Sequence, residues 1–160
     1  MKTKYEVELR PPRNALLPID ERYKENRLLT DGVLKAIEEW HELKVQKVYR
    51  NLVLVLPDGR LECDVLLRCS TPFGRERWIE IELKDRDLAK VLSQAVERRP
   101  LADYMYVVVG ELSLPALLDP VVRVYSSLFR NYLIGLFHED QMLITSRYRQ
   151  REVEYKEVVD

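Results

Sequence analysis

Hydrophobic and polar residues alternate strictly along Trp78–Lys84, and this pattern predicts a β-strand with two different faces. Successive side chains of a strand point to opposite faces, so three polar residues share one face and three aliphatic residues share the other. The polar residues are Glu80, Glu82 and Lys84, and the aliphatic ones are Ile79, Ile81 and Leu83. A neighbouring strand is predicted at Leu61–Cys69, where Asp64 shares a face with Glu62.

Turn signals divide the middle of the chain into three strands. Pro57–Arg60 and Ser70–Gly74 contain the Pro, Gly, Asp and Ser residues that are typical of turns. The strands that they separate are predicted at Lys44–Leu56, Leu61–Cys69 and Glu76–Lys84. Strands joined by short turns pair antiparallel, so we expect a three-stranded meander.

Helical patterns flank the meander on both sides. Glu21–Glu42 is mostly helix-forming, with Asp20 as a cap and a restart at Thr30 after a break. A second helix, capped by Asp87, is predicted to end near Arg99. The apolar run 104–109 then predicts a strand buried on both faces. A helix between two strands implies that those strands are parallel.

The two ends of the chain are harder to interpret from their patterns. The polar residues 1–19 predict an irregular arm, and the charged residues 149–160 predict an edge strand, a dimer contact or a frayed tail. Between the buried strand and the tail, we predict a helix over Leu114–Leu128 interrupted by Pro120 and a hairpin of Asn131–Phe137 and Gln141–Tyr148.

Composition places the chain among globular domains. Its 160 residues suit a single domain, and 46% of them are hydrophobic. The net charge of −1 argues against a protein that coats DNA through a global positive field, but it permits local basic patches. Cys63 and Cys69 are too few for a structural zinc site and lie too far apart for a disulfide. No signal peptide or membrane span is visible, so we expect an intracellular, cytoplasmic protein.

The acidic residues of the two neighbouring strands indicate a specific chemistry. Asp64, Glu82 and Lys84 are the minimum set that could hold a hard divalent cation beside a water molecule. This is the chemistry of phosphodiester hydrolysis. Alternatively, Glu80, Glu82 and Lys84 form a solvated strand face with cross-strand charge pairs.

The order of a helix, a three-stranded meander, a helix and a strand, with Asp64 and Glu82-Leu83-Lys84 on the meander, resembles the PD-(D/E)xK nuclease superfamily. This superfamily comprises the restriction-endonuclease-like folds, including archaeal Holliday-junction resolvases and many repair nucleases. The resemblance covers about residues 21–109. It implies an α/β fold, with a three-layer α/β/α core and a mixed central sheet flanked by helices, in one nuclease-like domain over residues 1–160.

The resemblance also assigns roles to individual residues. Asp64 matches the first metal-binding carboxylate, Glu82 matches the second, and Lys84 matches the lysine of the motif. Glu25 is the candidate for a glutamate that completes the metal shell, with Glu21 as the alternative.

Three further positions bear on this assignment. Gln94 matches a position where some branches place a polar residue that points into the site. The proline that precedes the first Asp in the superfamily is replaced here by Cys63. Glu80 lies on the same face as Glu82, so the choice of metal ligand between these two glutamates stays open.

The resemblance implies Mg²⁺ or Mn²⁺ as the cofactor. Mg²⁺ prefers octahedral oxygen ligands and retains several waters, so two carboxylates and the Leu83 carbonyl would leave positions for phosphate and water. Phosphate-backbone contacts are expected from basic clusters, although a solvated edge strand would explain the last cluster equally well. These clusters are Arg75 and Arg77, Arg98 and Arg99, and Arg147, Arg149 and Arg151.

These observations predict a divalent-metal-dependent DNA endonuclease, acting on double-stranded or branched DNA and possessing a structure-specific or repair role. The superfamily's resolvases and restriction enzymes are typically dimers, so the resemblance implies a homodimer. The alternative is a nuclease-fold binding or assembly subunit with little catalysis of its own, which the near-neutral charge favours. A nucleotide-pool hydrolase is less favoured, because no helical acidic repeat is visible.

Overall fold

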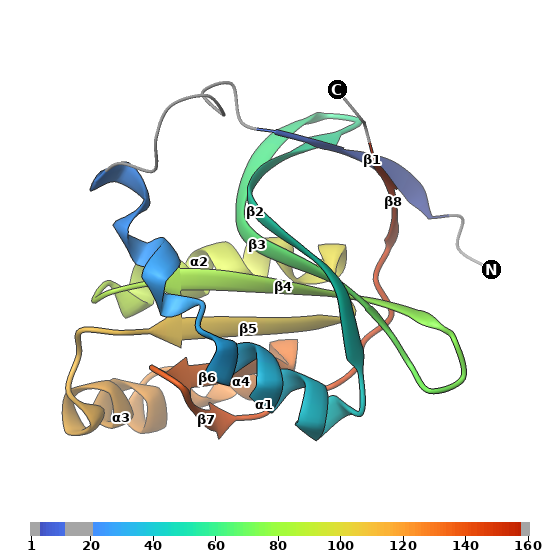
Figure 1. The fold of residues 1–160 in the computed structure, drawn as a ribbon. Coiled ribbons are helices and arrows are strands. Elements are labelled where there is room, and N and C mark those ends of the chain that lie inside the picture. The colour runs from blue at the N-terminus through green and yellow to red at the C-terminus, as the bar shows by residue number, and fades with distance from the viewer. Residues whose placement is uncertain (1–3, 12–20, 158–160) are drawn as a thin grey trace.

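The structure is a computed structural model that describes residues 4–11 and 21–157. Within these residues, eight strands form one mixed sheet in the order β7-β6-β5-β4-β3-β2-β1-β8 (Figure 1). The strands are β1 Tyr5–Arg10, β2 Lys44–Leu56, β3 Gly59–Ser70, β4 Glu76–Lys84, β5 Tyr104–Val109, β6 Ile134–His138, β7 Gln141–Ile144 and β8 Val153–Glu157. The α-helices are α1 Asp31–His41, α2 Leu88–Arg98, α3 Leu114–Arg123 and α4 Ser126–Tyr132, and the 3₁₀ segments are η1 Glu21–Leu28 and η2 Arg99–Leu101.

The predicted meander is confirmed. β2 pairs antiparallel with β3, and β3 pairs antiparallel with β4. β5 lies beside β4 in parallel, and α2 connects the two strands, as a helix between parallel strands must. The Asp87 side chain accepts a hydrogen bond from the Lys90 backbone N–H, so the predicted cap of this helix is also confirmed.

Different helices cover the two faces of the sheet, so the centre of the molecule has three layers (Figure 1). On one face, Val33 and Ile37 of α1 pack with Ile81 of β4 in a buried cluster. On the other face, α2, α3 and α4 pack against β5 and β6. These two buried clusters lie on opposite faces of the sheet, and a third cluster joins residues of β1, β2, β3 and β8 with Trp78 of β4.

The N-terminal arm was predicted to be irregular, and this is wrong for Tyr5–Arg10. These residues form β1, which pairs antiparallel with β2 and parallel with β8. Their alternation of buried and exposed side chains fits a strand with one covered face. The rest of the predicted arm, with the predicted cap Asp20, lies outside the described residues. Among the interpretations of the C-terminal segment, the edge strand is confirmed by β8.

The predicted helix at 21–42 consists of two elements. The first is the 3₁₀ segment η1, and the second is α1. The break lies at Thr30, whose hydroxyl accepts a hydrogen bond from the Val33 N–H and caps α1. The expected restart at this residue is therefore confirmed.

The C-terminal half departs from prediction at three boundaries. α3 continues through Pro120, and the chain leaves the helix only at Val124. The predicted hairpin exists as β6 and β7, but Asn131 belongs to α4 rather than to the first strand. The second strand ends at Ile144, so the following arginines do not alternate on a strand face.

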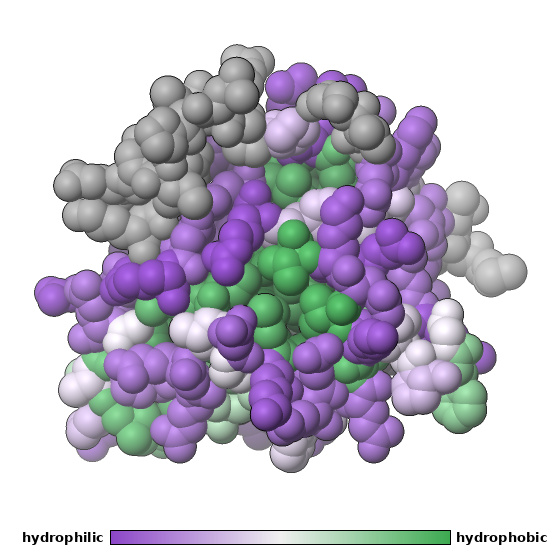
Figure 2. Space-filling model, viewed as in Figure 1, coloured by the Kyte–Doolittle hydropathy of each residue, from purple (hydrophilic) through white to green (hydrophobic). Residues whose placement is uncertain are grey.

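Hydrophobic side chains gather in the middle of one face of the molecule, and hydrophilic ones surround them (Figure 2). In the part of the chain that the structure describes, no helix combines the length and the apolarity that a membrane crossing requires.

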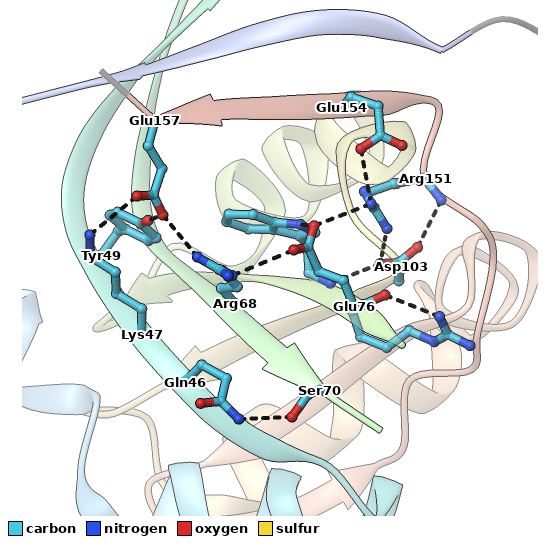
Figure 3. A network of polar contacts seen from close by, with 12 residues as sticks. Gln46, Lys47, Tyr49, Arg68, Ser70, Glu76, Asp103, Arg151, Glu154 and Glu157 are labelled. Carbon is cyan, nitrogen blue, oxygen red and sulfur yellow. Dashed lines mark hydrogen bonds and ion pairs between the residues drawn. The ribbon is translucent and has the colours of Figure 1, made fainter. Parts of the chain in front are cut away.

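A buried ion pair fixes β8 to the start of β5. The Asp103 carboxylate accepts hydrogen bonds from the backbone N–H groups of Trp78 and Arg151 and pairs with the Arg151 guanidinium at 2.9 Å. Arg151 also contacts Glu154 and Glu76, which places it at the centre of a polar network that continues to Glu157 through Arg68 (Figure 3). The Asp103 side chain is fully buried, so loss of its charge would leave the guanidinium poorly compensated.

We expect Asp103→Asn to lower the free energy of unfolding by about 3 kcal/mol, because it breaks a buried ion pair on one side. Urea denaturation measures this change. Asp119→Asn is the control, because Asp119 forms an exposed pair with Arg123 that should contribute less than about 1 kcal/mol. Equal losses in the two variants would show that the buried pair does not anchor β8.

Candidate active site

The polar face of β4 is buried, so its interpretation as a solvated face is wrong. Glu80 is 0% exposed and Glu82 is 1% exposed. The cause is the position of β4 in the sheet, because strands pair on both of its edges and helices or strands pack on both of its faces. Burial of carboxylates is costly unless they are compensated, and such groups are candidates for a functional site.

Asp64, on β3, contacts the end of β4. One oxygen of its carboxylate accepts a hydrogen bond from the backbone N–H of Leu83 at 2.9 Å. Continued by one pair, the register of the two strands sets Asp64 opposite Glu82, and repulsion from Glu82 contributes to the raised pKa of Asp64. The last paired residues of the two strands at this end are Val65 and Ile81, so Asp64 lies where the ladder opens. The structure therefore brings together the two carboxylates that the sequence assigned to a metal.

The carboxyl groups hold protons more tightly than usual. Burial, followed by repulsion from Glu82, raises the pKa of Asp64 to about 7. Burial and repulsion from Glu80 raise the pKa of Glu82 to about 8, and burial also raises the pKa of Glu80. Within the described residues, neither oxygen of Glu80 has a hydrogen-bond partner, and the groups that influence its pKa include Glu82, Arg98 and the Cys63 thiol.

One guanidinium faces these carboxyl groups. Arg98, at the end of α2, pairs with Glu82 at 2.7 Å, and its side chain is only 13% exposed. In the described part of the chain, Arg98 is thus the one cation paired with this group of three carboxyl groups. The Cys63 thiol beside them adds no negative charge, because its burial raises its pKa well above the usual value. Such a deficit of positive charge is typical of a site that accepts a cation.

Lys84 and Glu25 form a second pair at the end of β4. The Lys84 ammonium lies 3.7 Å from one Glu25 oxygen, and the other Glu25 oxygen accepts a hydrogen bond from the Asp85 N–H at 2.6 Å. Lys84 follows Glu82 by two residues, a spacing of roughly 7 Å along a strand. Both side chains of the pair are about one-third exposed, so this part of the site is open to solvent. Glu21, the alternative to Glu25, lies in η1, and its side chain is outside the described part of the chain.

The Leu83 carbonyl points in the same direction as the Leu83 N–H. In a strand, the N–H and C=O of one residue point to the same neighbouring strand. Because the Leu83 N–H binds Asp64 on β3, its carbonyl points to the same edge, beyond the last ladder pair. This places a backbone oxygen on the side of the strand where Asp64 lies.

The contact that Arg98 makes in the structure differs from the one predicted from the sequence. We expected a phosphate contact, but its side chain is directed to Glu82. The signal was present in the helix spacing, because Val91 and Ala95 face the sheet and Arg98 follows Ala95 by three residues. Gln94 is half-buried and precedes Arg98 by one turn, so the two side chains share a side of α2.

The other predicted phosphate-binding arginines fall into two groups. Arg99 is buried and donates to four backbone carbonyls, and Arg151 is buried in its ion pair with Asp103, so neither is accessible to a phosphate here. The accessible arginines lie near the end of the sheet where β4, β5 and β6 begin, opposite the end that carries Lys84. They are Arg75, Arg77, Arg147 and Arg149.

The oxygen donors suit a hard cation, although the side chains do not surround a common point. In residues 4–11 and 21–157, no group of three or more His, Cys, Asp or Glu side chains is arranged as a metal-ligand set. The chemistry of the donors nevertheless fits Mg²⁺ or Mn²⁺, since Asp64 and Glu82 contribute adjacent carboxylates and Glu80 contributes two oxygens without donors.

Comparison with protein-family models, with curated proteins and with solved structures gave no match for this chain. The functional assignment therefore rests on the site itself.

The raised pKa values predict how stability depends on pH without divalent ions. Between the usual values of 3.8 and 4.5 and the folded-state values near 7 and 8, the folded protein retains protons that the unfolded chain has released. The contribution of Asp64 and Glu82 to the free energy of unfolding is therefore full below about pH 4 and lost as the pH rises to 8.

Urea denaturation between pH 4 and 9 measures this dependence in the wild type, in Asp64→Asn and in Glu82→Gln. Each variant should flatten the decline, while Glu39→Gln, at an exposed position on α1, should leave it unchanged. Parallel curves for all four proteins would contradict the raised pKa values.

Proposed function

We propose that the chain is a divalent-metal-dependent DNA endonuclease of the PD-(D/E)xK type. The observation that carries the proposal is the hydrogen bond that the Asp64 carboxylate accepts from the Leu83 N–H, which places Asp64 beside Glu82 on the neighbouring strand, with Lys84 two residues further along. The pKa values of the Asp64 and Glu82 carboxyl groups are raised, so this pair of carboxyl groups favours additional positive charge. No other cluster in the described residues joins buried carboxylates to a lysine at the open end of a strand.

The arrangement of the elements supports the same proposal. α1, the meander β2-β3-β4, α2 and β5 follow one another in the order that the resemblance implies. The three-layer packing agrees with the restriction-endonuclease-like core expected from it. The proposed metal ligands come from the second and third strands of the meander, and Glu25 comes from the segment before the first helix.

Each residue then has a defined task. Asp64 and Glu82 would hold Mg²⁺ or Mn²⁺, with the Leu83 carbonyl as a further oxygen and with Glu25 reaching the site from η1. When bound, such an ion would supply Lewis-acid chemistry that acidifies water and polarises a phosphoryl oxygen. Lys84 would hold the attacking water or neutralise charge on the phosphate. Glu25 keeps the Lys84 ammonium at the end of β4, where its partial exposure lets a DNA phosphate approach.

The test is cleavage of plasmid and four-way-junction DNA with Mg²⁺ or Mn²⁺. We expect Asp64→Asn, Glu82→Gln and Lys84→Ala each to reduce the cleavage rate by about 100-fold or more, because each removes a charge that acts on the reacting phosphate. Glu39→Gln and Lys35→Ala are matched controls on the exposed side of α1 and should retain full activity. Cleavage that survives in both Asp64→Asn and Lys84→Ala would refute the proposal.

A second candidate function is a nuclease-fold subunit that binds or assembles without catalysis. The observation that favours it is the contact between Arg98 and Glu82, because the guanidinium occupies an oxygen that a metal would need. If this contact is permanent, Arg98 replaces the metal, and the site is structural. If the contact is broken when the ion binds, Arg98 is a counter-charge of the metal-free protein.

Arg98→Gln separates the two functions. For an active nuclease, we expect the wild type to bind Mn²⁺ in the millimolar range or more tightly, and the variant to bind it about 10-fold more tightly, because a competing cation has been removed. Calorimetric titration of Mn²⁺ measures both affinities, and Arg123→Gln on the exposed side of α3 is the control. Absence of Mn²⁺ binding in the wild type and in Arg98→Gln would favour the non-catalytic subunit.

A further inference from the structure

Aromatic and basic side chains meet at the end of the sheet where β4 begins, opposite the end that carries Lys84. The Arg77 guanidinium, at the start of β4, lies 4.7 Å from the centre of the Tyr148 ring. The Tyr148 ring in turn lies 5.8 Å from that of Tyr104, and the Tyr104 ring lies 4.1 Å from His41. Arg77 and Tyr148 come from two segments that were separately predicted to contact phosphates, and the fold brings these segments together. We call Arg77, Tyr148, Tyr104 and His41 the aromatic edge.

The aromatic edge is partly open to solvent. Tyr148 is 45% exposed, while Tyr104 and His41 are half-buried and support it from the side of the sheet covered by α1. Burial lowers the pKa of His41 to about 4, so its ring is neutral at physiological pH. The Tyr148 ring is therefore held by neighbouring rings, with little further freedom to lose when it binds a flat partner.

The positive charge beside these rings has no acidic partner in the part of the chain that the structure describes. Within the described residues, Arg77 and Arg75 form no ion pair with a carboxylate, in contrast to Arg68 on the adjacent strand β3, which pairs with both Glu76 and Glu157. The Glu76 carboxylate that neighbours Arg77 in sequence is directed to Arg68 and Arg151 (Figure 3). In a chain with a net charge of −1, the aromatic edge is thus a local site for an anion.

We propose that the aromatic edge binds single-stranded nucleic acid. An aromatic ring that is exposed and flanked by arginines fits an unpaired base, which stacks on the ring while the backbone phosphates meet the guanidinium groups. A duplex offers only its phosphates to such a surface, since its bases are already stacked. Read as a preference for a substrate, this inference rests on the proposed nuclease function. The preferred substrate would then be DNA with an unpaired segment.

The aromatic edge lies far from the candidate active site. Arg77 and Lys84 are seven residues apart on β4, which corresponds to roughly 23 Å. This equals the rise of about seven base pairs of B-form DNA. The aromatic edge and the candidate active site are thus separate surfaces, and binding at one can be measured without chemistry at the other.

The test is fluorescence anisotropy with a labelled 20-nucleotide single strand and the corresponding duplex, in EDTA so that no metal-dependent step contributes. Tyr148→Leu should weaken single-strand binding roughly 5- to 150-fold, because stacking of one base is lost, and should change duplex binding less than about 2-fold. Tyr148→Phe keeps the ring and should bind like the wild type. Arg77→Gln should weaken single-strand binding and reduce its dependence on salt.

Two variants provide matched controls. Tyr5→Leu alters a tyrosine of similar exposure on β1, and Arg123→Gln alters an exposed arginine on α3. Neither variant should affect the binding of single strands. The inference is overturned if the wild type binds no single strand, if Tyr148→Leu binds as tightly as the wild type, or if it weakens single-strand and duplex binding equally.

A negative result for the aromatic edge can be distinguished from a negative result for the proposed nuclease function. Single-strand binding that depends on Tyr148, in a protein that cleaves no DNA, would refute the nuclease and leave the aromatic edge established. Metal-dependent cleavage that requires Asp64, with single-strand binding that ignores Tyr148, would leave the nuclease and overturn the aromatic edge.

Discussion

The structure depends on β4, a strand whose carboxylate side chains are buried in the core of the protein. Glu80 and Glu82 are buried on β4, at the centre of the sheet, where burial of an uncompensated charge is costly. Arg98 supplies one positive charge, and protons retained by the carboxyl groups offset the remainder. A strand that served only to hold the sheet together would be more stable with apolar residues at these positions. Their presence is consistent with the proposed role in binding a cation.

Part of this site followed from the sequence. The alternation along β4 and the position of Asp64 on the preceding strand predicted which carboxylates meet, because register and side-chain parity are local properties of strands. The burial of Glu80 did not follow, since alternation shows which residues share a face and not what covers it. The partner of Glu82 was missed for a related reason, because Arg98 was interpreted from its charge and not from its position on the buried side of α2.

In the fold as well, features set by nearby residues were predicted from the sequence, and features set by distant residues were not. The bounds of β2, β4 and β5 were predicted correctly, because turn residues and hydrophobic runs mark them in the chain. β1 was missed because its parallel partner, β8, lies almost at the other end of the sequence, and a strand with both neighbours so distant has no turn to reveal it. Pro120 was overestimated as a helix breaker, since α3 accommodates it.

A crystal structure of the protein with Mn²⁺, using the anomalous signal of the metal, tests the central claim most directly. The account predicts an anomalous peak in contact with the carboxylates of Asp64 and Glu82, with the Arg98 guanidinium displaced from the 2.7 Å contact that it makes without metal. A map without a peak at this position, in which Arg98 still binds Glu82, would contradict it.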